Sequence, residues 1–413
     1  MPAKVTPVAG SRTGLTFRKK VAFGIIYAFF MVFSLLCVGE LTLRMLPAWS
    51  FKSAPFRRYD PDIGIALIPL THVTHRRGCF QGEVSVNQWG MRDRDRSLEK
   101  SPGVFRIALL GDSAIEGVHV VPNEVVNIRM ERLLADKGYK NVEVLNFGVE
   151  GIGTTQELLI YKERARRFHP DLVLLVFSGN DIMNNSSTLQ PKAYGFHTWY
   201  CPYFDLGPDG NLIFRPVESR SFNRVRSFLE AHSQVVYYFQ RTWGRVKLPF
   251  YNYTWQGIPI MWGGYGDPPD AEWRRAWLVT EKVMAMLHET VSDDGAKFIV
   301  VMWPDFHRID PDWQRRLNKE VGRLPPDFKP TSMEERLKEI ADRNRITFDL
   351  VYPYMQAYRD AHHLEWPYFS FTCDPHYSAL GHQVIAEAIV QRLEEHHLLP
   401  ERADRPKEWR ASK

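Results

Sequence analysis

Cysteine is scarce in this sequence, with four among 413 residues. Cys37, Cys79, Cys201 and Cys373 show no C-x-x-C spacing, which is typical of zinc sites, so we expect no metal. Four cysteines are also too few for a disulfide scaffold. One pair among the last three could form a bridge if the domain lies outside the cytoplasm, and unpaired buried thiols are an equally open alternative.

Long runs of like charge are absent as well. The net charge is +5, and no block of five or six like charges occurs, so we expect no nucleic acid partner. Hydrophobic residues make up 44% and charged residues 24%, which is ordinary for a globular protein and argues against disorder, collagen and a polytopic membrane protein.

One apolar run stands out. Residues 21–39 contain no charge, and Lys20 and Glu40 bound them. At ~1.5 Å per residue the run is just long enough to cross a hydrocarbon core of roughly 30 Å. No small-x-small cleavage site follows it directly, which favours a retained signal anchor over a cleaved signal peptide. Leu36 stands where a lipoprotein signal needs a small residue before Cys37, which argues against a lipid anchor.

The charges before this run predict its orientation. Five basic residues and no acidic one precede it: Lys4, Arg12, Arg18, Lys19 and Lys20. The positive-inside rule then places the N-terminus in the cytoplasm and the rest of the chain outside, in the periplasm if the cell is Gram-negative. We therefore expect a single-pass membrane protein.

The rest of the sequence divides by its pattern. We predict a cytoplasmic N-terminus (1–20), a transmembrane signal anchor (21–39), a polar Arg-rich lead-in (40–103), a catalytic domain (104–396) and a charged tail (397–413). Within the domain, residues 182–267 form an inserted cap or subdomain, because 19 of these 86 residues are aromatic, against 13% for the whole chain.

Short apolar runs alternate with amphipathic stretches after residue 104. The predicted strands are 105–110, 142–146, 172–177, 298–303 and 346–350, and the predicted helices are 123–137 with Asn123 as N-cap, 270–291 and 379–395. Alternation of this kind is typical of a parallel sheet with crossover helices.

Polar motifs follow the strands in a fixed order. Gly111-Asp112-Ser113 follows the first strand, 146–151 (Asn-Phe-Gly-Val-Glu-Gly) the second and Gly179-Asn180-Asp181 the third, while Asp374-Pro375-His376 precedes the last helix. A serine at the carboxyl end of a parallel strand lies where ligands bind in open α/β sheets. Any one of these motifs is a weak signal, and the ordered set is specific.

The set resembles the SGNH hydrolases, also called the GDSL esterase and lipase family, over residues 104–396 except the insertion. The resemblance implies an α/β fold with three layers, α/β/α and flavodoxin-like. It implies that Ser113 is the nucleophile, His376 the general base and Asp374 its orienting carboxylate. The oxyanion hole would be the Ser113 and Gly151 backbone N–H groups with the Asn180 side chain. It implies a serine esterase without metal or cofactor.

Physical chemistry agrees with these roles. A serine hydroxyl needs a base near neutral pH, and histidine, with a pKa near ~6.5, can take the proton and return it to the leaving group. An aspartate can fix the tautomer of the imidazole. One neutral donor in the oxyanion hole is worth ~3 kcal/mol in the transition state.

Three alternatives remain open. Asp305-Phe306-His307 has the same D-x-H spacing and also follows a predicted strand, although no glycine and final amphipathic helix follow it. The same site could hand its acyl group to a sugar hydroxyl, which would make the protein an O-acyltransferase of envelope polysaccharide. The chain could also be a non-catalytic glycan-binding module. We expect an ester or an acylated glycan as the substrate.

Overall fold

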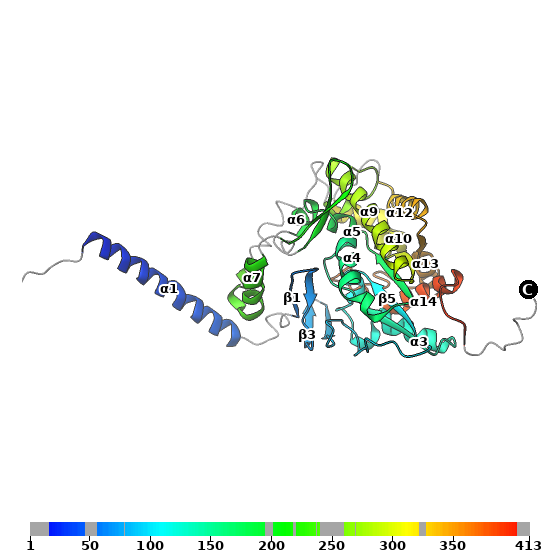
Figure 1. The fold of residues 1–413 in the computed structure, drawn as a ribbon, viewed down its shortest axis with the longest axis horizontal. Helices are drawn as coiled ribbons and strands as arrows, with labels where there is room; N and C mark the ends of the chain where they lie inside the picture. The colour runs from blue at the N-terminus through cyan, green and yellow to red at the C-terminus, as the bar shows by residue number, and fades with distance from the viewer. Residues whose placement is uncertain are drawn as a thin grey trace, which may run out of the picture.

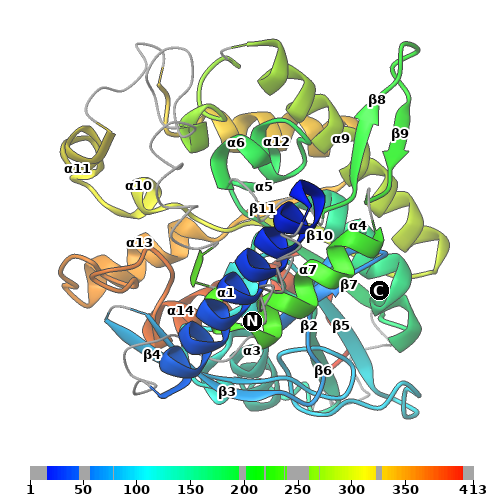
Figure 2. The same cartoon turned by 90° about the vertical axis from the view of Figure 1, so that its left-hand side faces the viewer.

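The structure is a computed structural model, and it describes residues 16–45, 56–77, 79–194, 201–217, 220–236, 238–239, 260–268, 270–321 and 328–402. Figure 1 shows a long N-terminal helix that projects from an α/β body, and Figure 2 shows the same molecule from the side of that helix.

A five-stranded parallel sheet forms the centre of the body. Its order is β11-β10-β7-β5-β6. The strands are β5 (Phe105–Leu110), β6 (Val142–Asn146), β7 (Leu172–Phe177), β10 (Lys297–Met302) and β11 (Thr347–Leu350). All six residues of the central strand β7 are buried, as a strand covered on both faces requires.

Helices cover both faces of the sheet and make the three layers that the resemblance implies. Core residues of α4 (Thr154–Glu163), α9 (Ala271–Asp293) and α12 (Ser332–Arg343) pack on one face. Those of α3 (Val126–Asp136), α13 (Tyr352–Ala361) and α14 (Ala379–Glu395) pack on the other. In Figure 1, α9 and α12 lie above β5 and α3 lies below it.

Shorter elements complete the body. They are the helices α2 (Ser113–Glu116), α5 (Asp181–Asn184), α6 (Leu189–Tyr194), α10 (Phe306–Ile309) and α11 (Trp313–Val321), with 3-10 turns at Pro122–Glu124, Ala165–Phe168 and Ile260–Trp262. The insertion contributes a hairpin of β8 (Tyr203–Leu206) and β9 (Leu212–Arg215) and the helix α7 (Arg220–His232).

The predicted strands agree with the structure within one residue at each end. The predicted N-cap Asn123 is wrong. Pro122, which is suited to a first helical position, starts a 3-10 turn at Pro122–Glu124, so α3 begins only at Val126 with Val125 as its cap. Asp270, the first residue of the predicted helix 270–291, is the N-cap of α9, since its side chain accepts a hydrogen bond from the Trp273 N–H.

The lead-in is more ordered than its sequence indicated. It forms two antiparallel hairpins, β1 (Arg57–Asp60) with β2 (Gly64–Leu67) and β3 (His72–Arg77) with β4 (Phe80–Ser85). β1 (Arg-Arg-Tyr-Asp) and β3 (His-Val-Thr-His-Arg-Arg) consist mostly of polar or charged residues, so no apolar run marks the two hairpins in the sequence.

The apolar run lies within the helix α1 (Phe17–Met45), which extends beyond it at both ends and has no buried residue. Among the described residues, α1 is the one helix long and apolar enough to cross a membrane.

Candidate active site

Ser113 lies at the carboxyl end of β5 and is the first residue of α2. The preceding Asp112 caps this short helix, because its Oδ1 accepts a hydrogen bond from the Ala114 N–H at 3.0 Å. A tight strand-to-helix turn of this kind presents the serine at the edge of the sheet where the neighbouring strands also end.

Three residues of the predicted set form one chain of hydrogen bonds. His376 Nε2 lies 2.9 Å from Ser113 Oγ, and His376 Nδ1 lies 2.5 Å from Asp374 Oδ1. The His376 backbone N–H also donates to Asp374 Oδ1, at 3.1 Å. With the proton on Nδ1, the imidazole presents a lone pair on Nε2 to the serine hydroxyl.

The charges of this pair stabilise each other. Burial acts to raise the pKa of Asp374, but the hydrogen bond from His376 and its charge outweigh burial and hold that pKa well below its usual range. Burial acts to lower the pKa of His376, and the hydrogen bond and charge of Asp374 outweigh it, so the pKa of His376 is raised. The arrangement therefore stabilises an imidazolium, the form that a general base takes after it accepts a proton.

The predicted oxyanion groups come from loops after three adjacent strands, β5, β6 and β7. Gly151 has φ +79, a conformation that favours glycine, and a Cβ there would meet nothing within 4 Å, so the side of this residue is open. Asn180 Nδ2 donates to Asp112 Oδ2 at 2.9 Å. The Asn180 amide nitrogen carries two N–H donors, so the bond to Asp112 uses one and fixes the orientation of the other.

The loop after β6 rests directly on α2. A Cβ on Gly148 would stand 2.3 Å from the Glu116 backbone nitrogen, so no side chain fits there. Asn146 Nδ2 donates to the Ile115 carbonyl at 2.8 Å. These contacts fix the Gly151 loop relative to the turn that carries Ser113.

Two further carboxyl groups lie buried beside Asp112. Burial and the charge of Asp112 raise the pKa of Glu157 well above its usual range. Burial, followed by the charges of Glu157 and Asp112, does the same for Asp181. Asp181 Oδ2 accepts the Ser178 N–H at 2.8 Å, so this side chain serves the turn after β7 and does not face solvent.

His119 was not singled out from the sequence, and it lies against the predicted base. Its ring stacks on His376 with centroids 3.9 Å apart and planes at 15°, and it is held from behind by Phe80 at 4.7 Å. Burial and then the charge of His376 lower the pKa of His119 to about 2, which keeps it neutral. No sequence signal marks it, because a single histidine in a loop has no characteristic spacing.

His119, Asp374 and His376 are the described group that could hold a metal ion, with ligand atoms within 4.8 Å of one another. His376 Nδ1 and Asp374 Oδ1 stand only 2.5 Å apart. Two ligands of one tetrahedral zinc ion lie roughly 3.3 Å apart, given metal–ligand bonds of about 2.0 to 2.1 Å. The geometry therefore suits a hydrogen-bonded pair better than a metal site.

The alternative histidine lies elsewhere. His307 is buried among aromatic rings, with Tyr265 at 4.9 Å and Trp262 at 5.8 Å between centroids. Burial lowers its pKa to about 3. Asp305 accepts a hydrogen bond from the Tyr265 hydroxyl. The described contacts thus place this D-x-H motif in the core beside the sheet and not against Ser113.

Arg92 of the lead-in connects the site to the hairpin of β3 and β4 by hydrogen bonds. Arg92, although 98% buried, donates from Nη2 to the carbonyls of Glu83 at 2.7 Å and Val120 at 2.5 Å. It also reaches the Glu116 carbonyl at 3.3 Å, so one side chain ties the hairpin of β4 to the end of α2.

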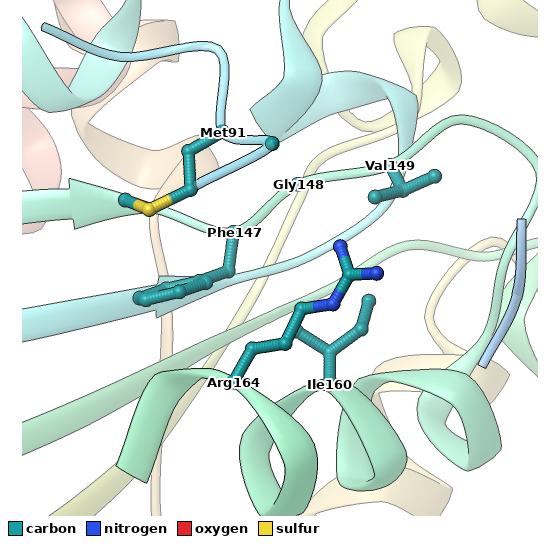
Figure 3. A pocket seen from close by; sticks show the side chains of 7 residues that line it. Met91, Phe147, Gly148, Val149, Ile160 and Arg164 are labelled. Carbon is teal, nitrogen blue, oxygen red and sulfur yellow. The ribbon is translucent and has the colours of Figure 1, made fainter. Parts of the chain in front are cut away.

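A small pocket beneath the Gly151 loop is lined by Gly90, Met91, Phe147, Gly148, Val149, Ile160 and Arg164 (Figure 3). None of the residues proposed for catalysis lines it. The pocket therefore does not mark the position of the substrate.

Cys79 and Cys373 form a disulfide with a Cα–Cα distance of 5.8 Å. It joins the turn between β3 and β4 to the residue directly before Asp374. Of the other cysteines, Cys37 is exposed on α1 and Cys201 is buried, and burial raises the pKa of the Cys201 thiol to about 12. Of the three cysteines after the apolar run, Cys79 and Cys373 form the disulfide that was one alternative, and Cys201 is the unpaired buried thiol that was the other.

We expect the double substitution Cys79→Ser/Cys373→Ser to lower kcat several-fold and the stability by about 3 kcal/mol. The reason is that the loop with Asp374 and His376 loses its tie to the lead-in. The measurements are kcat and the thermal midpoint, with Cys37→Ser as the matched control, since this thiol is exposed on α1. Unchanged values in the double variant, or reactive thiols at 79 and 373 in the native protein, would contradict this role.

An α/β/α sheet with a Ser–His–Asp chain of hydrogen bonds at its carboxyl edge defines the class of the serine hydrolases. This chain belongs to the GDSL-like lipase/acylhydrolase family, whose model matches residues 109–331. The protein is therefore an ester-hydrolysing enzyme. The matched span contains Ser113, Gly151 and Asn180 and ends before Asp374 and His376.

Solved structures of the same kind are similar to this chain at low identity. A lipase/acylhydrolase from Enterococcus faecalis is 14% identical, covers 71% of this chain and 97% of its own, and has a TM-score of 0.37. A GDSL-like lipase from Bacteroides thetaiotaomicron is 14% identical, with 70% and 88% covered and a TM-score of 0.32. An acetyl xylan esterase is 11% identical, with 70% and 100% covered and a TM-score of 0.36. No curated protein matches the chain significantly.

Proposed function

We propose that the protein is a membrane-anchored serine esterase that removes O-acyl groups from a glycan or a lipid-like ester outside the cytoplasm. Ser113, His376 and Asp374 are its catalytic residues. The observation that carries the assignment is the chain of two hydrogen bonds, 2.9 Å and 2.5 Å long, from Ser113 through His376 to Asp374.

The first half of the reaction forms an acyl-enzyme. His376 Nε2 takes the Ser113 proton while Oγ attacks the ester carbonyl carbon. The carbonyl oxygen becomes an oxyanion, which accepts hydrogen bonds from the Ser113 and Gly151 N–H groups and the Asn180 amide. The tetrahedral intermediate collapses, the bond to the alcohol oxygen breaks, and His376 gives its proton to the departing alcohol.

The second half repeats these steps with water. His376 takes a proton from water as the water oxygen attacks the acyl carbon, and the bond between the acyl carbon and Ser113 Oγ then breaks. Ser113 regains its proton from His376 and the carboxylic acid leaves. Throughout, Asp374 holds the imidazole in one tautomer and stabilises its positive charge.

The proposed location rests on α1 and on the disulfide. α1 is 29 residues long, which is enough to span a membrane, and none of its residues is buried against the body. The basic residues before it favour a cytoplasmic N-terminus. A disulfide between Cys79 and Cys373 fits an oxidising compartment. The catalytic domain would then be extracytoplasmic, where acylated envelope glycans and lipids are the esters within reach.

The aromatic insertion supports this substrate class only in part. Tyr203, Trp262 and Tyr265 are buried and form core rather than a sugar-stacking surface. The exposed rings of the described insertion are Phe214 on β9, Phe222 and Phe228 on α7, and Phe239. Residues 195–200, 218–219, 237 and 240–259 of the insertion lie outside the described residues.

The experiment that tests the function uses the full-length chain in detergent. Acetyl, butyryl, octanoyl and lauroyl esters of p-nitrophenol and an acetylated oligosaccharide are offered, and free acid is measured. We expect acid release together with an acyl adduct on Ser113 that mass spectrometry detects after rapid quenching. Adduct formation with transfer to sugar hydroxyls instead of water would replace the esterase by the acyltransferase. Neither adduct nor release from any ester would contradict both and favour a binding module.

A further inference from the structure

Helix α7 has its two faces reversed relative to an ordinary surface helix. Val225 lies three residues after Phe222, and Phe228 and Leu229 lie three and four residues after Val225, so the four share one face, and each is between 43% and 60% exposed. The face toward the body carries Asn223 and Arg226, which are at least nine-tenths buried. A helix of a globular protein normally turns its apolar stripe to the core, so an outward stripe indicates a second apolar surface, which the described residues of this domain do not supply.

The inward polar face is fixed to the body by specific bonds. The Tyr59 backbone N–H of β1 donates to Ser227 Oγ at 3.0 Å. Arg226 Nε donates to Glu230 Oε1 at 2.7 Å along the same face. Rotating the helix to bury its phenylalanines would break the bond between Tyr59 and Ser227 and expose the buried Asn223 and Arg226, so these contacts hold the apolar stripe outward.

The end of α7 is also tied to α1. Arg44 Nη2 donates to the His232 carbonyl at 2.6 Å. The Glu40 carboxylate accepts from Ser233 Oγ at 2.9 Å and from the N–H groups of Gln234 and Val235 at 3.0 and 3.1 Å. Figure 1 shows α7 between the end of α1 and the strands of the body, and Figure 2 shows the two helices next to each other.

These ties place α7 at a defined depth. Glu40 is the first charge after the uncharged run 21–39, so it marks the level at which α1 would leave the hydrocarbon core. The polar headgroup layer is about 5 to 8 Å thick on each side, which α1 crosses in roughly four or five residues at ~1.5 Å each. Glu40 to Arg44 span this layer, and both hold α7.

We propose that α7 is an interfacial helix. The stripe of Phe222, Val225, Phe228 and Leu229 lies in the boundary between the headgroups and the acyl chains of the membrane that α1 spans. This inference rests on the proposed anchoring by α1. Arg44 at the end of α1 and Arg224 on α7 are exposed, and guanidinium groups can bind lipid phosphates. The domain is thereby held by two contacts in one orientation rather than on a single tether.

The second contact also orients the active site. β1, which bonds α7 through Tyr59, carries Arg57, and Arg57 pairs with Glu116 at 2.8 Å and Glu150 at 2.6 Å. Glu150 directly precedes Gly151 in the proposed oxyanion loop. A continuous set of contacts thus joins the membrane-facing helix to the site, so the entrance to Ser113 keeps a fixed position relative to the bilayer.

The test measures lipid contact in the full-length protein reconstituted into phosphatidylcholine vesicles with or without a doxyl-labelled phosphatidylcholine. A fluorescent label is attached in turn to the native Cys37 and, in a Cys37→Ser background, to Phe228→Cys, Val225→Cys and Leu278→Cys. Cys201 is buried and Cys79 and Cys373 are bonded, so they do not react. Leu278 is the matched control, 49% exposed on α9, which Figure 1 shows away from α1. Ester turnover of each variant verifies its fold.

We expect labels at positions 37, 225 and 228 to lose about half of their fluorescence to the doxyl lipid, and the label at 278 to lose less than about a tenth. Quenching at 37 without quenching at 225 and 228 would overturn the interfacial helix while the anchor stands. A blue-shifted but unquenched label at 228 would also overturn it, because protein, such as a second copy of the chain, would then cover the stripe. No quenching at 37 would refute the anchor itself.

Discussion

Ser113→Ala should lower kcat/KM for ester hydrolysis by about 10⁴-fold or more, because the acyl-enzyme cannot form without Oγ. The fold should not change. Ser113 Oγ bonds His376, while the turn around it is held by Asp112 and by Asn146 through groups that an alanine leaves in place. The measurements are kcat/KM with p-nitrophenyl acetate, circular dichroism and the thermal midpoint.

Ser292→Ala is the matched control, since Ser292 is exposed near the end of α9 and should lose no activity. A serine-directed phosphonate should label the wild type at Ser113 and leave the alanine variant unlabelled. Turnover near the wild-type rate, or labelling of another serine in the variant, would contradict the assignment of the nucleophile.

Much of the fold could be predicted because buried parallel strands have a strong local pattern. β7 is a continuous apolar run, Leu-Val-Leu-Leu-Val-Phe, and every residue of it is buried. Motifs that follow such strands must meet at one sheet edge, so the order of Ser113, Gly151 and Asn180 along the chain already predicted their neighbourhood. These features depend on residues within a few positions of each other.

The features that could not be predicted depend on contacts between distant segments. Cys79 and Cys373 are 294 residues apart, and which cysteines pair is decided by the packing of the β3–β4 turn against the loop of His376. The stacking of His119 on His376 also depends on this packing, because Phe80 of the same hairpin contacts the other side of the His119 ring. The four-residue strands β1 and β2 form because they pair with each other and pack under α7, and neither contact has a local pattern.

The outward stripe of α7 shows the opposite case. Its spacing is an ordinary amphipathic pattern, and pattern alone predicts that the apolar face is buried. The bond from the Tyr59 N–H to Ser227 and the burial of Asn223 and Arg226 decide the contrary orientation. The aromatic residues of α7 therefore do not by themselves predict a buried face, because the tertiary structure decides which face of the helix is covered.

The two D-x-H motifs, with His376 and His307, should respond differently to the loss of their histidine. His376→Ala should lower kcat by about 10⁴-fold or more, since Ser113 loses its base, while His307→Ala should change kcat by less than about threefold. The structure separates the two by contact: His376 Nε2 lies 2.9 Å from Ser113 Oγ, whereas His307 lies among Tyr265 and Trp262. His307→Ala removes a buried ring, so its thermal midpoint should fall even though its kcat remains.

The dependence of the rate on pH distinguishes a base from a structural histidine. Only the neutral imidazole accepts a proton, so kcat/KM should fall with acid as His376 is protonated in the free enzyme. Because the hydrogen bond and charge of Asp374 raise the pKa of His376, the midpoint of this fall should lie above the ordinary value of about 6.5. Asp374→Asn should lower kcat by about 10⁴-fold and move the midpoint to lower pH, since the charge that raised the pKa is gone.

A His307→Ala enzyme that loses its activity while His376→Ala keeps it would reverse the assignment. An acid limb that does not move in Asp374→Asn would mean that a group other than His376 titrates.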